Sequence, residues 1–229
     1  MMPRGGRMLP YLSELAALST LAVASLHDVR SRMVPDWVWL PGSILGVAIK
    51  LLDPGGTLQF IIRYWPFLLL LSLMLIMEWF LSLSGQADVL AYLTLSLLLT
   101  GNCTFPDALL VYLLSKVLIA LMIPCQFLVN FFRIIGNRGL MDGFDEPLWR
   151  KILAMMLLSP YDRRIARCAS TAEVSVDGRR RFVLRAALRI SCDDPPEEGK
   201  WIAPAYPAMP FIFAATLLVI SPLGMTLKC

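Results

Sequence analysis

Residues 60–83 read FIIRYWPFLLLLSLMLIMEWFLSL, a long apolar run in which the only charged side chains are Arg63 and Glu78. A helix needs about 20 mostly apolar residues to cross the hydrocarbon core of a bilayer, so this run predicts a transmembrane helix. The rest of the chain agrees, because 57% of its 229 residues are hydrophobic and only 17% are charged, against roughly 25% charged residues in a typical soluble domain. The composition excludes a soluble enzyme, a disordered chain and a disulfide scaffold, and it indicates a protein that crosses the membrane several times.

Five further apolar segments flank this run and bring the predicted number of spans to six. They are residues 9–26, 37–52, 89–99, 108–132 and 206–223. Clusters of turn-forming residues at 53–56 and 101–107 separate neighbouring spans, and prolines suited to a first helical turn precede the last span. The predicted fold class is therefore an all-α membrane protein with six transmembrane helices.

The segment 133–203 differs in composition from the rest of the chain. It holds 13 of the 21 Lys and Arg residues and 10 of the 17 Asp and Glu residues. A helix is predicted over 148–158, and strands over 172–176 and 182–190 flank Asp177-Gly178, a favourable hairpin turn. We therefore expect a small α+β insert between the fifth and sixth spans. It divides the chain into a five-span region (1–132), the insert (133–203), and the sixth span with a C-terminal tail (204–229).

Basic residues near the span ends predict the orientation of the chain. Arg133, Arg138 and Lys200 flank the insert, and the positive-inside rule therefore places it in the cytoplasm. With six spans, both termini then lie outside. An Ala-x-Ala pattern at 22–24 imitates the cleavage site of a secretory signal, but Glu14 interrupts the apolar run before it and five spans follow.

Two aspartates are the main candidates for chemistry, because ionisable side chains are costly in or near a membrane span. Asp28 ends the first span and Asp88 begins the fourth, so the predicted topology puts both at the cytoplasmic side. Gly85, Gln86 and Ala87 predict a small-residue turn that an extended chain can approach closely. Two facing carboxylates do not ionise together easily, and such a pair activates water in aspartic proteases. Two unrelated aspartates, each capping its own helix, are the alternative.

The other ionisable groups give weaker evidence for a functional site. Glu78 lies well inside the third span, where a hydrogen bond to a neighbouring helix is the simpler interpretation. Together with Asp88 and Lys116 it instead suggests the proton relay of a small transporter. The only histidine is His27, and the five cysteines include no C-x-x-C pair, which argues against a metal site and favours unpaired thiols. We expect no cofactor.

Two segments resemble the catalytic segments of type IV prepilin peptidases, a family of GxGD membrane aspartic proteases. Residues 24–39, ASLHDVRSRMVPDWVW, place Asp28 at a helix end with Arg30 two residues later. Residues 85–88, Gly-Gln-Ala-Asp, resemble the G-x-G-D segment, with Ala87 in place of the second glycine. The layout of six spans with an insert before the last is most similar to the archaeal preflagellin and prepilin peptidases.

The resemblance implies a membrane aspartic endopeptidase. Such an enzyme removes the short basic leader, a class III signal peptide, from preflagellin or type IV prepilin-like precursors at the cytoplasmic face of the plasma membrane. Asp28 and Asp88 then activate water, and Arg30 orients Asp28 or a substrate carbonyl. The implied partners are the precursor proteins and the lipid bilayer, with no nucleic acid and no metal. The alternatives are the proton-coupled transporter and a non-catalytic assembly protein of a pilus or archaellum.

The resemblance also implies supporting residues around the pair. Gly85, Gln86 and Ala87 form the segment against which the substrate backbone is expected to lie. In the insert, charge alone makes Asp145 and Glu146, with Asp142 beside them, candidates for attracting a basic leader.

Overall fold

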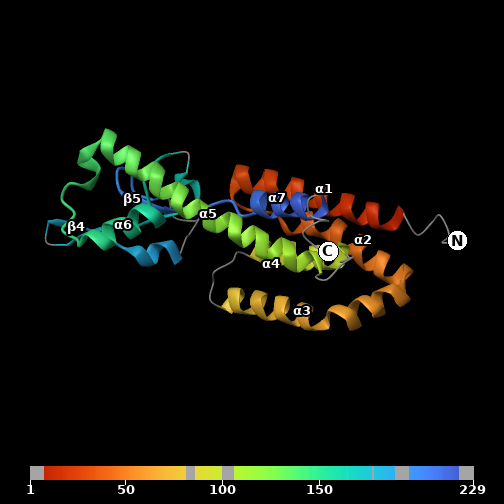
Figure 1. Ribbon diagram of the computed structural model, residues 1–229. Coiled ribbons are helices and arrows are strands. Elements are labelled where there is room, and N and C mark those ends of the chain that lie inside the picture. The colour runs from red at the N-terminus through yellow and green to blue at the C-terminus, as the bar shows by residue number, and fades with distance from the viewer. Residues whose placement is uncertain are drawn as a thin grey trace. The chain divides into compact units, whose positions relative to one another are not determined.

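The computed structural model describes residues 8–80, 86–99, 106–163, 165–176, 178–188 and 196–221 (Figure 1). The chain forms two compact units. Unit 1 comprises Met1–Leu118 and Pro207–Cys229, and unit 2 comprises Ile119–Tyr206. Unit 1 contains both aspartates that the sequence singles out, and the segment expected to form the insert belongs to unit 2.

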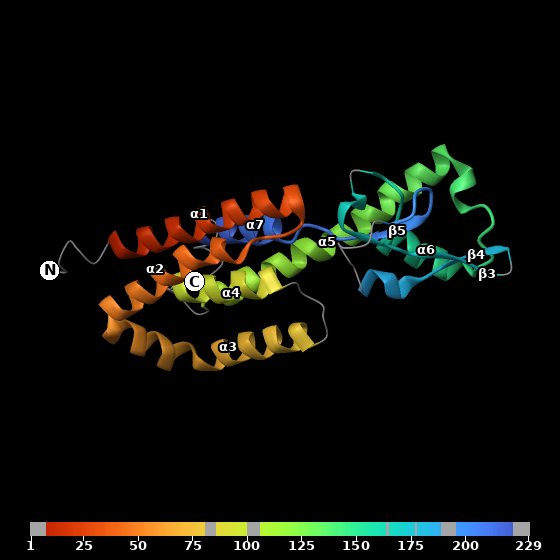
Figure 2. The same ribbon diagram turned by 180° about the vertical axis from the view of Figure 1, so that it is seen from behind.

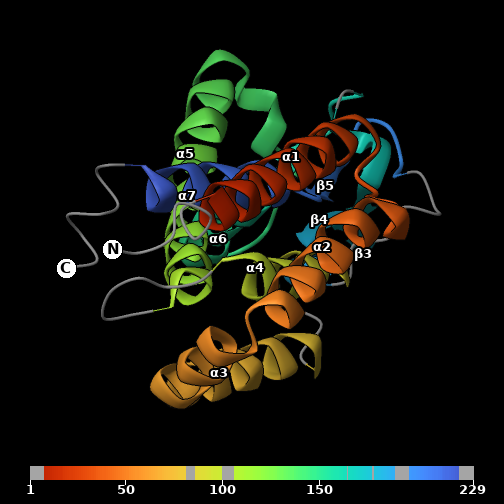
Figure 3. The same ribbon diagram turned by 90° about the vertical axis from the view of Figure 1, so that its right-hand side faces the viewer.

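Unit 1 is built from helices that pack side by side. Their bounds are α1 Met8–Ser31, α2 Trp39–Leu52, α3 Pro54–Phe80, α4 Gln86–Leu98, the first part of α5 Asp107–Gly136, and α7 Met209–Ile220. A short 3-10 helix over Asp36–Val38 leads into α2. In Figures 1, 2 and 3, α2 lies between α1 and α3, and it also packs against α4. Each apolar segment predicted from the sequence is thus mainly helical over the residues that the structure describes.

The break between α2 and α3 is the single residue Asp53, where the sequence predicts a turn over 53–56. The backbone N–H of Gly56 donates to Asp53 Oδ1 over 2.9 Å, and that of Thr57 donates to the Asp53 carbonyl over 3.0 Å. A Cβ on Gly56 would overlap Asp53 Oδ2. The predicted turn is therefore wrong in extent. The Asp53 carboxylate supplies an acceptor that the start of a helix lacks, so α3 begins directly after it.

Two helices among the described residues are long and apolar enough to cross a membrane, Pro54–Glu78 and Asp107–Gly136. The apolar helices α4 and α7 have 13 and 12 residues, fewer than the roughly 20 that a bilayer requires. The structure therefore confirms a mainly helical chain with two candidate spans, and it does not confirm six. Large apolar side chains on α3 are more than half exposed, among them Leu69, Ile76 and Phe80. Lipid covers such a face in a membrane protein.

Glycines let α2 approach its neighbours closely. A Cβ on Gly42 would lie 2.9 Å from Thr20 Oγ1 of α1, and a Cβ on Gly46 would lie 2.8 Å from Leu97 Cβ of α4. The two glycines are four residues apart and so lie on one face of α2. Small residues at this spacing bring helix backbones together in membrane proteins, where packing replaces the hydrophobic effect between helices. The glycine pair thus sets how tightly α2 packs between α1 and α4.

Unit 2 combines the second part of α5 with a helix and short strands. Their bounds are α6 Leu148–Leu157, β1 Ser159–Pro160, β2 Ala169–Thr171, β3 Glu173–Val176, β4 Arg179–Phe182 and β5 Trp201–Pro204. Strand β5 pairs antiparallel with β1 and β2, and β3 pairs antiparallel with β4, which lies beside α6 (Figure 2). The predicted helix and the antiparallel pairing of two strands are confirmed, but the second strand is Arg179–Phe182 and not 182–190.

Two expectations for unit 2 are wrong. Leu184–Leu188 is a 3-10 helix and not part of a strand. The Ala186 N–H turns back to the Val183 carbonyl over 2.9 Å, which ends the extended run after β4. Cys168 is disulfide-bonded, so the expectation of an unpaired thiol fails at this position.

Three aromatic rings form the core of unit 2. Phe144 and Phe182 stack with their centroids 4.0 Å apart, and Trp201 meets Phe182 edge-on at 5.3 Å. Glu173 joins the two sheets, because its carboxylate accepts from Arg180 Nε over 2.6 Å and from the Trp201 N–H over 3.0 Å. Burial acts to raise the pKa of Glu173, but these hydrogen bonds outweigh burial and hold that pKa below its ordinary value. Unit 2 therefore has a core of its own.

Candidate active site

Asp28 lies near the end of α1 and continues a buried stripe along that helix. Ala17, Leu21 and Ala24 precede it on the same face, and each is at most 1% exposed. The Asp28 residue is itself only 9% exposed. Its Oδ2 accepts the backbone N–H of Met209, the first residue of α7, over 2.9 Å. The carboxylate thus sits at the positive end of the α7 dipole, which is a favourable place for an anion.

The chain leaves α1 through Arg32, which has a positive φ of 59°. Its N–H donates to the Asp28 carbonyl over 3.0 Å and closes the end of the helix. Its guanidinium also interacts electrostatically with Asp28. Arg30 is exposed, and because two residues along a helix turn by about 200°, it projects from a different face of α1. A role for Arg30 with the substrate stays a prediction. Arg32, and not Arg30, is thus the arginine beside Asp28. Its spacing of four residues, about one helical turn, is the sequence signal that could have identified this neighbour.

Asp88 is half-buried in the first turn of α4. The sequence predicts a turn over residues 85–87, but Gln86 and Ala87 are already helical, in keeping with the helical preference of both residue types. Gly85 lies outside the described residues. Ala87 packs against the core of unit 1, and Gln86 is exposed. A carboxylate in a first helical turn also stabilises the helix.

The two aspartates extend from one core. Asp88 shares a face of α4 with Ala91, Tyr92 and Leu95, all of them buried, and this stripe and the stripe of α1 belong to the same apolar cluster. Helices α1 and α4 pack together, and α1 ends where α4 begins, at the same end of unit 1 (Figures 1 and 2). Both carboxylates thus lie at that end. Across the described ranges, no three His, Cys, Asp or Glu side chains gather as a metal site would require.

Glu78 of α3 is bound to α5. Lys116 Nζ lies 2.9 Å from Glu78 Oε1, and the Tyr112 hydroxyl donates to the same oxygen over 2.7 Å. Beside them, the Tyr92 hydroxyl and Ser115 Oγ are 2.7 Å apart and join α4 to α5. The interpretation of Glu78 as hydrogen-bonded to a neighbouring helix is confirmed. These contacts give Glu78 and Lys116 a structural role in holding three helices together.

Two acidic residues of the insert make ion pairs within unit 2. Asp145 pairs with Arg179. Glu146 lies 3.2 Å from Arg150 and accepts the backbone N–H of Phe182 over 3.0 Å. Neighbouring guanidinium groups thus already balance the charges of Asp145 and Glu146, two of the three acidic residues that the sequence suggests for attracting a basic leader.

A comparison with protein families adds an independent observation. Residues 15–125 match the model of the type IV leader peptidase family. The matched segment runs from α1 into α5, and it includes Asp28 and Asp88. The comparisons with curated proteins and with solved structures find no match.

Proposed function

The chain belongs to the type IV leader peptidase family, and from this premise we propose that it is a membrane aspartic endopeptidase with Asp28 and Asp88 as its catalytic pair. Its proposed substrates are preflagellin or type IV prepilin-like precursors, from which it removes the short basic leader. The observation that carries the proposal is the family match over residues 15–125, which spans both aspartates. Their position on the core faces of two packed helices supports it.

The proposed reaction needs one ionised and one protonated carboxyl group, a state that two facing carboxylates favour. The ionised group takes a proton from a water molecule, whose oxygen attacks the scissile carbonyl carbon. The other group donates its proton to the carbonyl oxygen. The first carboxyl group then gives the proton it took from water to the leaving nitrogen, and the second carboxylate takes a hydroxyl proton from the tetrahedral intermediate. The C–N bond breaks, the products are a carboxylic acid and an amine, and the pair again holds one proton. Asp28 Oδ2 accepts the Met209 N–H. We therefore propose that the other carboxylate oxygen, Oδ1, binds the water molecule.

The proposed topology keeps six spans, with α1, α2, α4 and α7 crossing beside the two long apolar helices. The shorter helices α2, α4 and α7 then need flanking residues or a locally thinned bilayer to complete their crossings. The positive-inside rule, applied to Arg133 and Lys200, supports a cytoplasmic insert. The active site then faces the same side as the insert, where a basic leader is accessible. We also propose that Arg30 and the segment Gly85, Gln86 and Ala87 contact the substrate. We further propose that the protein belongs with the archaeal members of the family, which its layout resembles.

Replacing each aspartate tests the proposed mechanism. Asp28→Asn and Asp88→Asn are each expected to lower the rate of leader removal by about 100-fold or more, because an amide neither takes up the proton of water nor donates a carboxyl proton. The measurement is the shift from precursor to mature protein on an immunoblot, with a co-expressed prepilin as substrate.

Asp36→Asn is the matched control. Asp36 is an exposed aspartate in the 3-10 helix just after α1, and its replacement is expected to leave cleavage at the wild-type rate. Membrane fractionation of all three variants separates loss of chemistry from loss of insertion. Full processing by Asp28→Asn or by Asp88→Asn would contradict the mechanism.

A further inference from the structure

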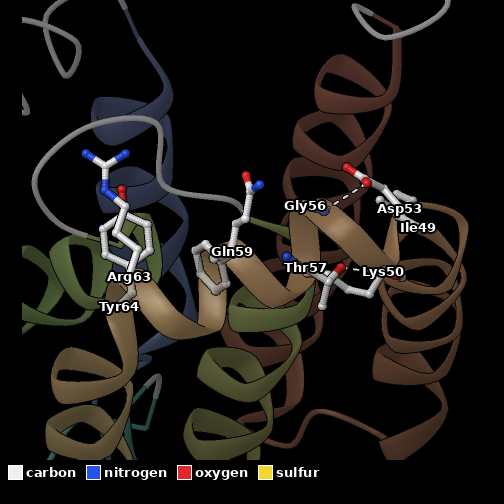
Figure 4. A pocket seen from close by; sticks show the side chains of 9 residues that line it. Ile49, Lys50, Asp53, Gly56, Thr57, Gln59, Arg63 and Tyr64 are labelled. Atoms are coloured by element: carbon white, nitrogen blue, oxygen red, sulfur yellow. Dashed lines mark hydrogen bonds between the residues drawn. The ribbon is translucent and has the colours of Figure 1, made fainter.

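A cavity of about 310 Å³ lies at the corner between α2 and α3. This corner is at the opposite end of unit 1 from the two aspartates (Figure 1). Figure 4 shows Lys50 extending from α2, and Gln59 and Arg63 standing one helical turn apart on α3. The Thr57 hydroxyl donates to the Lys50 carbonyl over 3.0 Å and fixes the corner. The cavity is thus a built feature of the helical unit.

Lys50 is the unusual residue of this cavity. Its Nζ is buried, and no atom of the described residues accepts a hydrogen bond from it. The Phe60 ring centroid lies 4.4 Å from Nζ, but a ring faces only one side of an ammonium group that carries three N–H donors. A buried ammonium without acceptors is costly. The ammonium group therefore needs an acceptor from outside the chain, either water or a ligand held in the cavity that Lys50 lines.

The charges of the lining favour an anion. Arg63 adds a second positive group, and its guanidinium lies 5.3 Å from the Tyr64 ring. Asp53 is the negative side chain of the lining, but its Oδ1 already accepts the Gly56 N–H at the start of α3. Two cations against one anion leave the lining with a net positive charge.

The surface around the corner is apolar. Leu51 and Leu52 at the end of α2, and Leu58 and Ile62 on α3, are each more than half exposed. A cationic cavity beside exposed apolar side chains matches the two parts of a phospholipid, a charged headgroup and acyl chains. We propose that this cavity binds a phosphate group, with Lys50 and Arg63 as its donors and an anionic phospholipid headgroup as its source in the membrane. This site is independent of the proposed proteolysis.

Lipid-dependent stability of the purified full-length protein in neutral detergent tests the proposal. Phosphatidylglycerol is expected to raise the unfolding temperature, while diacylglycerol with the same acyl chains leaves it unchanged. Lys50→Met is expected to need about tenfold more phosphatidylglycerol for the same rise, because it loses a charge-assisted hydrogen bond. Arg63→Gln is a second variant with the same expected direction. Lys151→Met, which removes a lysine of α6, is the charge-matched control and is expected to respond like the wild type.

A further arm distinguishes the two sources of phosphate. Inorganic phosphate is compared with sodium chloride at equal ionic strength. Stabilisation by phosphatidylglycerol alone, dependent on Lys50, supports a lipid headgroup, whereas equal Lys50-dependent stabilisation by inorganic phosphate supports a site for free phosphate. An equal response of the wild type and Lys50→Met, or equal stabilisation by diacylglycerol, overturns the proposal. Asp28→Asn is expected to keep the full lipid response, so that failure of one proposal leaves the other standing.

Discussion

The Asp28 carboxylate accepts the N–H of Met209, which lies 181 positions later in the chain. A candidate catalytic group therefore also holds the start of α7 against α1. This double role decides the choice of substitution, because asparagine keeps an acceptor oxygen for the Met209 N–H while it loses the acid–base chemistry. Loss of cleavage in Asp28→Asn thus reports on chemistry, whereas loss in an alanine variant would also report on α7.

Glu78 provides a second test at the residue scale. Glu78→Gln is expected to destabilise the protein by about 1–2 kcal/mol, because it leaves the partly buried Lys116 ammonium without its counter-charge. Leader removal is expected to continue. Thermal unfolding in detergent and the immunoblot assay measure the two effects.

The double variant Glu78→Gln/Lys116→Met is the control for this ion pair. It removes both charges together and is expected to recover part of the lost stability, since the two residues are in contact. Loss of cleavage in Glu78→Gln without any loss of stability would contradict the structural role and place Glu78 in the chemistry of cleavage.

At the scale of elements, the close packing of α2 depends on Gly46. Gly46→Ala is expected to destabilise the protein by about 1–3 kcal/mol, because the added Cβ would lie 2.8 Å from Leu97 Cβ and α2 must move away from α4. Gly136→Ala in α5 is the matched control, since nothing lies within 4 Å of its added Cβ. Alanine there is expected to be neutral or slightly stabilising. Equal unfolding temperatures for the two variants would contradict the role of Gly46.

At the scale of the whole molecule, the proposed topology places the two ends of unit 1 on opposite sides of the membrane. On a background that lacks the free thiols but keeps the disulfide of Cys168, Gly55→Cys is expected to react with an impermeable maleimide in intact cells, because it lies at the α2–α3 corner. Asp36→Cys lies at the other end and is expected to react only after the cells are permeabilised. Labelling of both positions from the same side would contradict the proposed six spans.

Much of the architecture was readable from local sequence. The apolar segments become helices, β3 and β4 pair as an antiparallel hairpin, and the helix of the insert begins at Leu148 as predicted. Hydrophobic runs and turn residues act through near neighbours, so they need no knowledge of packing. Element ends were harder to predict. The turn predicted over 53–56 is the single residue Asp53, and the residues Gln86 and Ala87 of a predicted turn belong to α4. Capping and packing decide where a helix begins.

Two conclusions follow from the order of residues alone, the membrane character of the chain and the choice of two candidate aspartates. Charge is rare in an apolar sequence, so every carboxylate near a span is conspicuous. The contacts of those side chains, by contrast, depend on how the helices pack. Asp28 contacts α7, Glu78 pairs with Lys116, and Lys50 is buried without an acceptor among the described residues. These outcomes join residues far apart in the chain, and their free energy depends on how helices pack and not on the order of residues along any one helix.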